Sequence, residues 1–184
     1  MVRILVNAIA FQVGWFSCVL GAAHGHGWLG PTVVAGLVVL HLLLSKARQT
    51  EVHLVFVAIA GGLVLDSLLV VSGIFSPKRF VLPSPLTAAW MLALWANFAT
   101  TLNVSLGRLQ GHPYVAAALG AVFGPLAYYS GARMGAAEIH EPTALSLLLI
   151  AVTWAIATPG LLLVARRSAT QSPRQSRAPH QRIR

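Results

Sequence analysis

Long apolar runs fill the chain from near its start to about residue 165, and short polar segments separate them. A helix rises ~1.5 Å per residue, so about 20 residues cross the ~30 Å hydrocarbon layer of a membrane. The runs lack the alternation of a barrel strand, and backbone groups in lipid must be satisfied within their own segment. We therefore predict six transmembrane helices, over residues 4–23, 29–45, 52–74, 86–105, 113–132 and 143–165.

The composition supports a membrane protein. Hydrophobic residues make up 57% of the 184 residues and charged residues only 9%, whereas soluble domains have about 25% charged residues. We expect an all-α, polytopic transmembrane bundle over residues 1–165 and a disordered, basic cytoplasmic tail over residues 166–184. The first segment weakly resembles a cleaved signal peptide, but Asn7, Gln12 and Trp15 interrupt its apolar core, so we predict a retained helix.

The basic residues predict the orientation. Ten of the 13 Lys and Arg residues fall in the tail and in one alternating set of connecting segments, and only Lys78, Arg79 and Arg133 fall in the other. The positive-inside rule then puts both termini in the cytoplasm. The formal charge of +9 follows from this topology, and the tail has no aromatic residues to stack on bases, so we expect no nucleic-acid partner. Membrane lipids are the expected partners, with a membrane protein as another.

An aspartate interrupts the third apolar run, in GLVLDSLLVV (62–71). At helical spacing it shares one face with Ala58, Gly62 and Gly73, and small residues let helices pack closely. A buried carboxylate in a membrane needs a partner, a water-filled cavity or a proton. Asp66 is therefore the first candidate for a polar site, in the outer half of the membrane.

The fifth run offers its partners. Its small-residue face is interrupted by a tyrosine, in the order Gly120, Gly124, Tyr128, Gly131 and Gly135. We expect Arg133, at the outer end of this run, to reach Asp66 beside Tyr128 or Tyr129, while Glu138 competes for the arginine. This outer group is read either as a structural ion pair or as a pocket for a headgroup, an ion or a proton.

A second polar group belongs to the inner half of the membrane. Its members are amide, hydroxyl, imidazole and guanidinium side chains of four predicted segments: Asn7, Gln12, His41, Asn97, Thr101, Asn103 and Arg108. Buried amides usually hydrogen-bond between helices. Alternatively, Asn103 and Arg108 bind a lipid phosphate at the inner interface.

Neither a metal site nor a catalytic site is predicted. The HGHG segment (24–27) and His140 lack a third ligand at defined spacing. The chain has no G-x-S-x-G, H-E-x-x-H, Walker or dinucleotide-binding motif. Of the four acidic residues, Glu51 is assigned to a cytoplasmic loop, which leaves no intramembrane carboxylate pair. We therefore expect no cofactor and name no catalytic residue.

Four segments resemble a known family: NAIAFQVGWFSCVLGA (7–22), LVLDSLL around Asp66, FATTLNVSLGRL (98–109) and GPLAYYSGARMGA (124–136). They are similar to a bacterial integral membrane family, domain-of-unknown-function family 2878, over roughly residues 3–165. The resemblance implies an inner-membrane location and supplies no activity. It supports testing seven positions: Asn7, Gln12, Trp15, Asp66, Asn103, Tyr129 and Arg133.

Three classes of function remain open. The small-residue faces and missing motifs favour a non-catalytic component of the bacterial inner membrane that binds lipid or holds a partner. A small transporter would use Asp66 for a proton or ion, and a water-accessible path would join Asp66 to Asn7 and Asn103. A lipid-modifying enzyme would instead bring Asp66, Arg133 and Tyr129 together in a lipid-accessible pocket.

Overall fold

The chain folds into a bundle of six α-helices in a computed structural model that describes residues 1–79, 82–83 and 85–171. Each helix overlaps one of the six predicted apolar segments: α1 (Val2–Ala23), α2 (Leu29–Leu44), α3 (Arg48–Val71), α4 (Ala89–Ala99), α5 (Pro113–Arg133) and α6 (Thr143–Gln171). A short 3₁₀ helix, η1 (Gly107–Gly111), precedes α5. The antiparallel strands β1 (Phe75–Pro77) and β2 (Ala137–Ile139) pair Ser76 with Glu138. The all-α bundle class is confirmed.

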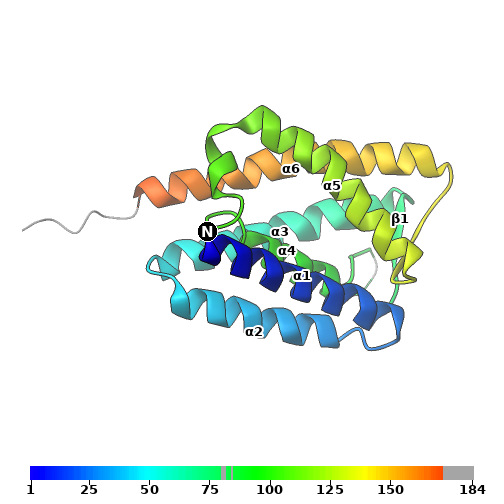
Figure 1. The fold of residues 1–184 in the computed structure, drawn as a ribbon. Helices are drawn as coiled ribbons and strands as arrows, with labels where there is room; N and C mark the ends of the chain where they lie inside the picture. The colour runs from blue at the N-terminus through cyan, green and yellow to red at the C-terminus, as the bar shows by residue number, and fades with distance from the viewer. Residues whose placement is uncertain (80–81, 84, 172–184) are drawn as a thin grey trace, which may run out of the picture.

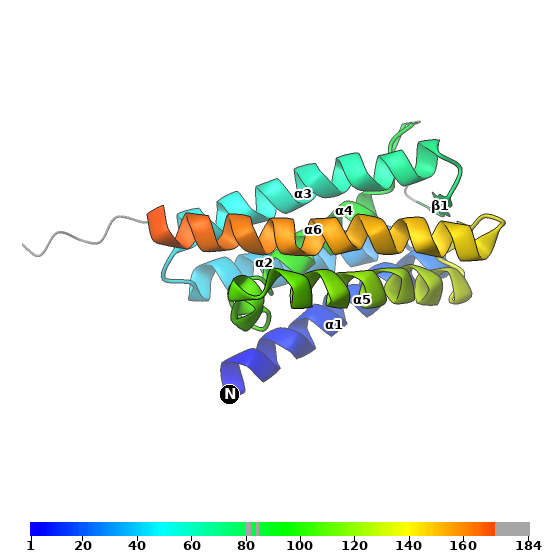
Figure 2. The same ribbon diagram turned by 90° about the horizontal axis from the view of Figure 1, so that it is seen from above.

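The six helices run along the length of the bundle, with α4 at its centre (Figure 1). α4 packs against α1, α2 and α3, while α5 packs mainly on α6. The start of α1, η1 and the last turns of α6 lie at one end, which we call the basic end. The opposite end carries β1 and β2 and is called the β end (Figures 1 and 2).

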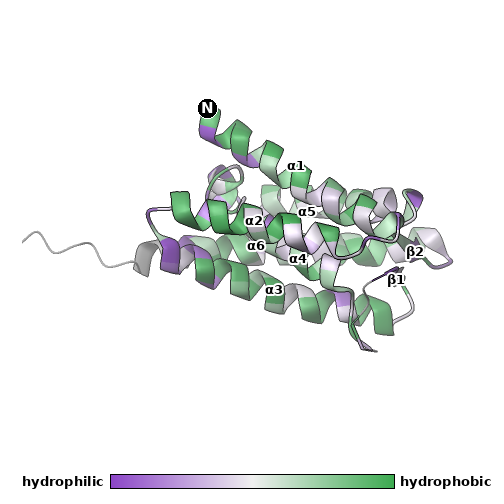
Figure 3. Cartoon of the chain, turned by 90° about the horizontal axis from the view of Figure 1, so that it is seen from below, coloured by the Kyte–Doolittle hydropathy of each residue, from purple (hydrophilic) through white to green (hydrophobic). Residues whose placement is uncertain are grey.

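Hydrophobic residues dominate the helices along their length (Figure 3). Four helices, α1, α3, α5 and α6, are long and apolar enough to cross a membrane. Large apolar side chains also point outward, as Phe56 on α3 and Ile156 on α6 do, each 70% exposed. An outward apolar surface of this extent fits hydrocarbon and not water. The protein is a membrane protein.

The fourth predicted span is much shorter than expected. α4 has 11 residues, or ~16 Å of helix at about 1.5 Å per residue, instead of the predicted 86–105. After Ala99 the chain continues in turns whose backbone bonds reach back three residues, such as Thr100 N to Asn97 O at 3.2 Å. Non-helical backbone is tolerated at membrane depth when protein surrounds it. Thr100, Thr101 and Leu102 are all buried, which meets this condition.

Two glycines of the predicted small-residue faces end helices instead of packing inside them. Gly73 follows α3 with φ +66°, and Gly135 follows α5 with φ +92°. Both are exposed. The left-handed conformation favours glycine because glycine has no Cβ. The packing faces therefore end at Leu69 on α3 and at Gly131 on α5.

The last helix extends beyond its predicted end at residue 165. α6 continues to Gln171, so residues 166–171 are helical and that part of the tail prediction is wrong. Residues 172–184 lie outside the described part of the chain.

Candidate functional site

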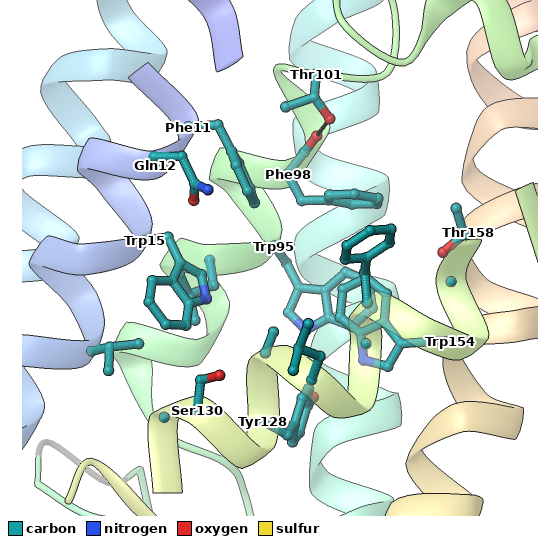
Figure 4. A pocket seen from close by; sticks show the side chains of 18 of the residues that line it. Phe11, Gln12, Trp15, Trp95, Phe98, Thr101, Tyr128, Ser130, Trp154 and Thr158 are labelled. Atoms are coloured by element: carbon teal, nitrogen blue, oxygen red, sulfur yellow. Dashed lines mark hydrogen bonds between the residues drawn. The ribbon is translucent and has the colours of Figure 1, made fainter. Parts of the chain in front are cut away.

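A cavity of about 530 Å³ lies between α1, α4, α5 and α6, within the usual size range of ligand pockets, ~300–1,000 Å³. Aromatic side chains from all four helices line it, and Figure 4 shows several of them converging on the same space. The aromatic lining comprises Phe11, Trp15, Phe16, Phe75, Trp90, Trp95, Phe98, Phe123, Tyr128 and Trp154. The few polar members are Gln12, Thr101, Ser105, Ser130 and Thr158. The cavity is therefore suited to an apolar ligand.

The cavity opens sideways, between α1 and α5. Lining side chains on both helices are partly exposed there, Phe16 by 45% and Phe123 by 59%. The two helices lie close at the β end and diverge toward the basic end (Figures 1 and 2). Both helices are long and apolar enough to cross a membrane.

The β end of the cavity is covered by the strand pair. Phe75 of β1 and Ala137 of β2 line the cavity and are almost fully buried. At the other end the lining is formed by Ser105, Leu106 and Leu109, next to and on η1. The cavity thus has a covered β end and ends at η1 toward the basic end.

Asp66 lies directly behind the cavity wall. Its side chain is fully buried, and Trp95 Nε1 donates a hydrogen bond to Oδ2 at 2.8 Å. The Tyr128 hydroxyl donates to Oδ1. Both donors line the cavity, whereas Asp66 does not. The carboxyl group therefore orients two side chains of the wall.

The predicted pairing of Asp66 with Arg133 is wrong. Tyr128 lies on the buried small-residue face of α5, and a helix turns ~100° per residue, so Arg133 points ~140° away from it. Arg133 is exposed, and neither it nor Asp66 forms an ion pair with any residue in the described ranges. Tyr129, 43% exposed, also points away from Asp66.

Glu138 does not compete for Arg133, contrary to the prediction. It extends from β2 to Lys78, with Nζ to Oε1 at 2.8 Å. The Lys78 ammonium hydrogen-bonds to the carboxylate and attracts it, which lowers the pKa of Glu138. Both side chains are largely accessible, Glu138 by 59%, so water screens the pair and its contribution to stability is small.

Glycines make room for the aromatic wall. A Cβ on Gly62, one turn before Asp66, would lie 2.1 Å from Trp95 Cδ1. A Cβ on Gly124 would lie 2.3 Å from Trp154 Cγ. The Trp95 and Trp154 rings stack, with centroids 4.7 Å apart and planes at 8°. The small-residue faces of α3 and α5 thus leave the space that the Trp95 and Trp154 rings occupy.

The inner polar residues mainly form hydrogen bonds with the backbone of the segment that follows α4. Asn7 Nδ2 donates to Thr100 O at 3.1 Å, and Asn7 Oδ1 accepts from Ser105 Oγ at 2.6 Å and from Ser105 N at 3.3 Å. Gln110 Nε2 donates to Leu102 O at 3.0 Å. Backbone groups that lose helical partners need such replacements inside a membrane. Asn7 therefore holds the end of α4 against α1.

Asn97 and Thr101 also bond to backbone. Asn97 Nδ2 donates to Phe11 O at 2.8 Å, and Thr101 Oγ1 donates to Phe98 O at 2.6 Å. Gln12 is exposed and lines the cavity, and its amide forms no hydrogen bond within the described part of the chain. Arg108 is exposed on η1. Of the predicted inner group, Gln12 and Thr101 line the cavity.

His41 and Asn103 instead meet at Glu51, which the sequence had assigned to a loop. Glu51 lies in the first turn of α3 and is only 5% exposed. Its Oε2 is 3.1 Å from His41 Nε2, and its Oε1 accepts from Asn103 Nδ2 at 3.1 Å. Asn103 Oδ1 accepts from Gln110 Nε2 at 2.8 Å. Asn103 is thus engaged by protein groups, which removes the basis for pairing it with Arg108 around a phosphate.

Sequence reasoning missed two parts of the site. Trp95 and Trp154 were not named as site residues, although each falls within a predicted span and pairs with a glycine of a facing helix. Glu51 was placed one residue before its predicted span. Since only four acidic residues occur in the chain, an acid so near an apolar run was a signal that it belongs to the helix.

Comparisons with known proteins give a family and no activity. The family model described as a protein of unknown function, family 2878, matches residues 4–160. Neither the search of curated proteins nor the search of solved structures gave a match.

Proposed function

The chain belongs to domain-of-unknown-function family 2878, and we propose that it is a lipid-binding protein that takes an acyl chain from the bilayer into the cavity between α1 and α5. The observation that carries the proposal is a cavity of about 530 Å³ whose lining side chains Phe16 and Phe123 are partly exposed on α1 and α5, two helices long enough to span the membrane. The Lys and Arg asymmetry supports a multi-pass location in the bacterial inner membrane with both termini in the cytoplasm.

The chemistry of the wall supports an apolar ligand. Stacked and edge-on aromatic contacts, such as those of Trp154 with Trp95 and Phe98, hold the wall rigid. A preformed apolar surface binds a chain without first ordering its own side chains. The buried Asp66 anchors the Trp95 and Tyr128 side chains by hydrogen bonds, which fixes the shape of the cavity.

Transport and catalysis both require a group that a substrate can reach. Asp66 has no exposed surface, both of its oxygens accept hydrogen bonds from cavity-lining residues, and it is absent from the lining. A path for protons or ions through Asp66 has no support from this arrangement. Binding is therefore the proposal that the geometry favours.

The test is to reduce the cavity volume by substitution and to measure the amount of lipid that remains bound. Ala8 and Ala127 line the cavity on opposite sides, and Ala8→Phe or Ala127→Phe would occupy part of it. The matched control is Ala35→Phe, at an exposed position of α2, a helix that does not line the cavity. Native mass spectrometry of protein released from lipid nanodiscs should show several-fold less bound lipid for the two cavity variants alone. Equal lipid retention in all four proteins would overturn the proposal.

A further inference from the structure

Most polar groups of the cavity wall are already occupied or covered by the protein itself. Thr101 and Ser105 donate their hydroxyl hydrogens to protein oxygen atoms, each at 2.6 Å. Trp154 Nε1 and Thr158 Oγ1 have almost no accessible surface, so a ligand does not reach them. Within the part of the chain that the structure describes, no charged side chain lines the cavity. Any polar contact with a ligand must therefore come from the few lining groups that remain.

Three polar groups of the lining remain open to a ligand. They are the Gln12 amide and the Trp15 indole N–H on α1, and the Ser130 hydroxyl on α5. None of them hydrogen-bonds to a described residue. Gln12 is exposed, and Trp15 Nε1 and Ser130 Oγ both retain accessible surface. Figure 4 shows Trp15 between Gln12 and Ser130 on one side of the cavity.

The packing of α1 on α5 brings these groups together. Gln12 and Trp15 are three residues apart on α1, so they share a face of the helix. A Cβ on Gly131, the residue after Ser130, would lie 3.9 Å from Val19 Cγ2. Val19 follows Trp15 by about one helical turn and also lines the cavity. Ser130 therefore belongs to the part of α5 that meets α1 next to Trp15.

The position of Gln12 along α1 makes an unpartnered amide unfavourable. Gln12 is the eleventh of the 22 residues of α1, which places it ~15 Å from either end of the helix at about 1.5 Å per residue. Its side chain is too short to reach a headgroup layer from there. Polar side chains at this depth are rare and usually mark a functional site. A ligand group that hydrogen-bonds to Gln12 and Trp15 would satisfy them.

The two side chains on α1 indicate the chemistry of that ligand group. An indole N–H only donates, and an amide NH₂ offers two further donors, so the group that fits is an acceptor such as a carbonyl oxygen. A phosphate or an ammonium group would find no counter-ion in the described lining, and burying an unpaired charge is strongly unfavourable. A phospholipid holds its ester carbonyls next to its charged headgroup, whereas an uncharged lipid has no charge that keeps its carbonyls at the membrane surface.

We infer that the ligand is an uncharged acyl ester of the diacylglycerol class, whose ester carbonyls accept hydrogen bonds from Gln12 and Trp15. The Ser130 hydroxyl both donates and accepts, so it suits the free hydroxyl of such a lipid. This inference rests on the proposed function and adds the class of lipid.

The experiment compares two lipids that differ only in their carbonyl groups. Protein in nanodiscs of phosphatidylcholine receives equal small amounts of a diacylglycerol and of the dialkylglycerol with the same chains, which has ether links instead of esters. Native mass spectrometry identifies the bound lipid. Gln12→Leu and Trp15→Phe each remove one donor and keep an apolar side chain of similar size. The matched controls are Trp28→Phe, at an exposed indole before α2, and Ser17→Ala on α1, two positions that do not line the cavity.

Wild type and both controls should retain the diacylglycerol in preference to the dialkylglycerol. Gln12→Leu and Trp15→Phe should each lower this preference by about fivefold, the effect of one hydrogen bond. An unchanged preference in either variant would overturn the inference. So would wild-type protein that retains phosphatidylcholine in proportion to its share of the nanodisc, because a charged lipid would then bind equally well.

Two further arms separate the possible failures. Ala8→Phe should reduce all bound lipid; if it reduces none, the proposed function fails. If Ala8→Phe reduces bound lipid while Gln12→Leu keeps the preference for the ester, only the inference fails. In a parallel sample, a prenyl quinone supplies the other common source of an uncharged carbonyl. Replacement of the bound diacylglycerol by an equal amount of the quinone would also overturn the inference, since the carbonyl would then belong to a ring and not to an ester.

Discussion

The hydroxyl of Tyr128 on α5 donates a hydrogen bond to Oδ1 of Asp66 on α3. The other carboxyl oxygen, Oδ2, accepts from Trp95 on α4. One buried carboxyl group therefore joins three helices, and two of the joined side chains form the wall of the cavity. The relationship gives Asp66 a structural reason for lying inside an apolar run.

Removing the Tyr128 hydroxyl should destabilise the protein. Tyr128→Phe leaves Oδ1 of Asp66 buried without its donor, and a lost hydrogen bond to an ionisable group changes the free energy of unfolding by ~1.5–3 kcal/mol. Denaturant-induced unfolding in detergent micelles measures this change. Tyr129→Phe makes the same chemical change one residue away on an exposed side chain, and we expect less than about 0.5 kcal/mol there. Equal losses in the two variants would contradict the assigned hydrogen bond.

Replacing each of two adjacent glycines of α3 by alanine should change the stability of the protein in opposite directions. A Cβ on Gly62 would meet the Trp95 ring at 2.1 Å, whereas a Cβ on Gly61 meets nothing within 4 Å. Overpacking reduces stability by ~1–3 kcal/mol, while replacing an unhindered helical glycine by alanine adds up to ~1 kcal/mol. The melting temperature of Gly62→Ala should therefore lie below that of wild type. The melting temperature of Gly61→Ala should lie above it. A stable Gly62→Ala variant would mean that the indole does not lie on this glycine.

Replacing Asn7 should reduce the stability of the protein more than replacing Gln12, the other amide side chain of α1. Asn7→Ala leaves Thr100 O without its side-chain donor and removes the acceptor of Ser105. We expect a loss of ~1–3 kcal/mol in unfolding free energy, the effect of unsatisfied buried polar groups. Gln12→Ala removes a similar amide that forms no hydrogen bond with the described residues. Hydrogen exchange of the amides at 100–105 should rise in Asn7→Ala only, and comparable exchange in both variants would refute the role of Asn7.

Removing the buried carboxylate of Glu51 should reduce stability much more than removing the exposed carboxylate of Glu138. Glu51→Ala leaves the Asn103 amide and the His41 imidazole without their shared acceptor in a buried setting. A loss of about 2 kcal/mol is expected. Glu138→Ala breaks an exposed pair with Lys78, and such pairs contribute ~0–1 kcal/mol. Unfolding of both variants by titration with sodium dodecyl sulfate compares them directly. A larger effect at Glu138 would contradict the burial of Glu51.

The sequence by itself determined the class of the protein and the places where helices form. Segment length and hydrophobicity are local properties, and a membrane requires about 20 apolar residues in a self-satisfied helix. Helical periodicity also identified the packed faces at Ala58, Gly62 and Asp66 on α3 and at Gly120 and Gly124 on α5, all of which are buried. Such faces follow from 3.6 residues per turn and need no knowledge of the neighbouring helix.

Only the tertiary structure decided which groups meet. Arg133 satisfied every local criterion as a partner for Asp66, yet the rotation of α5 presents Tyr128 instead. The apolar run of 86–105 gave no sign that α4 ends at Ala99, because the side chains that replace the missing backbone bonds, Asn7 and Gln110, come from other segments. The cavity is lined by side chains that α1, α4, α5 and α6 contribute together. Crossing angles and side-chain directions depend on how all six helices pack at once, and no single segment encodes them.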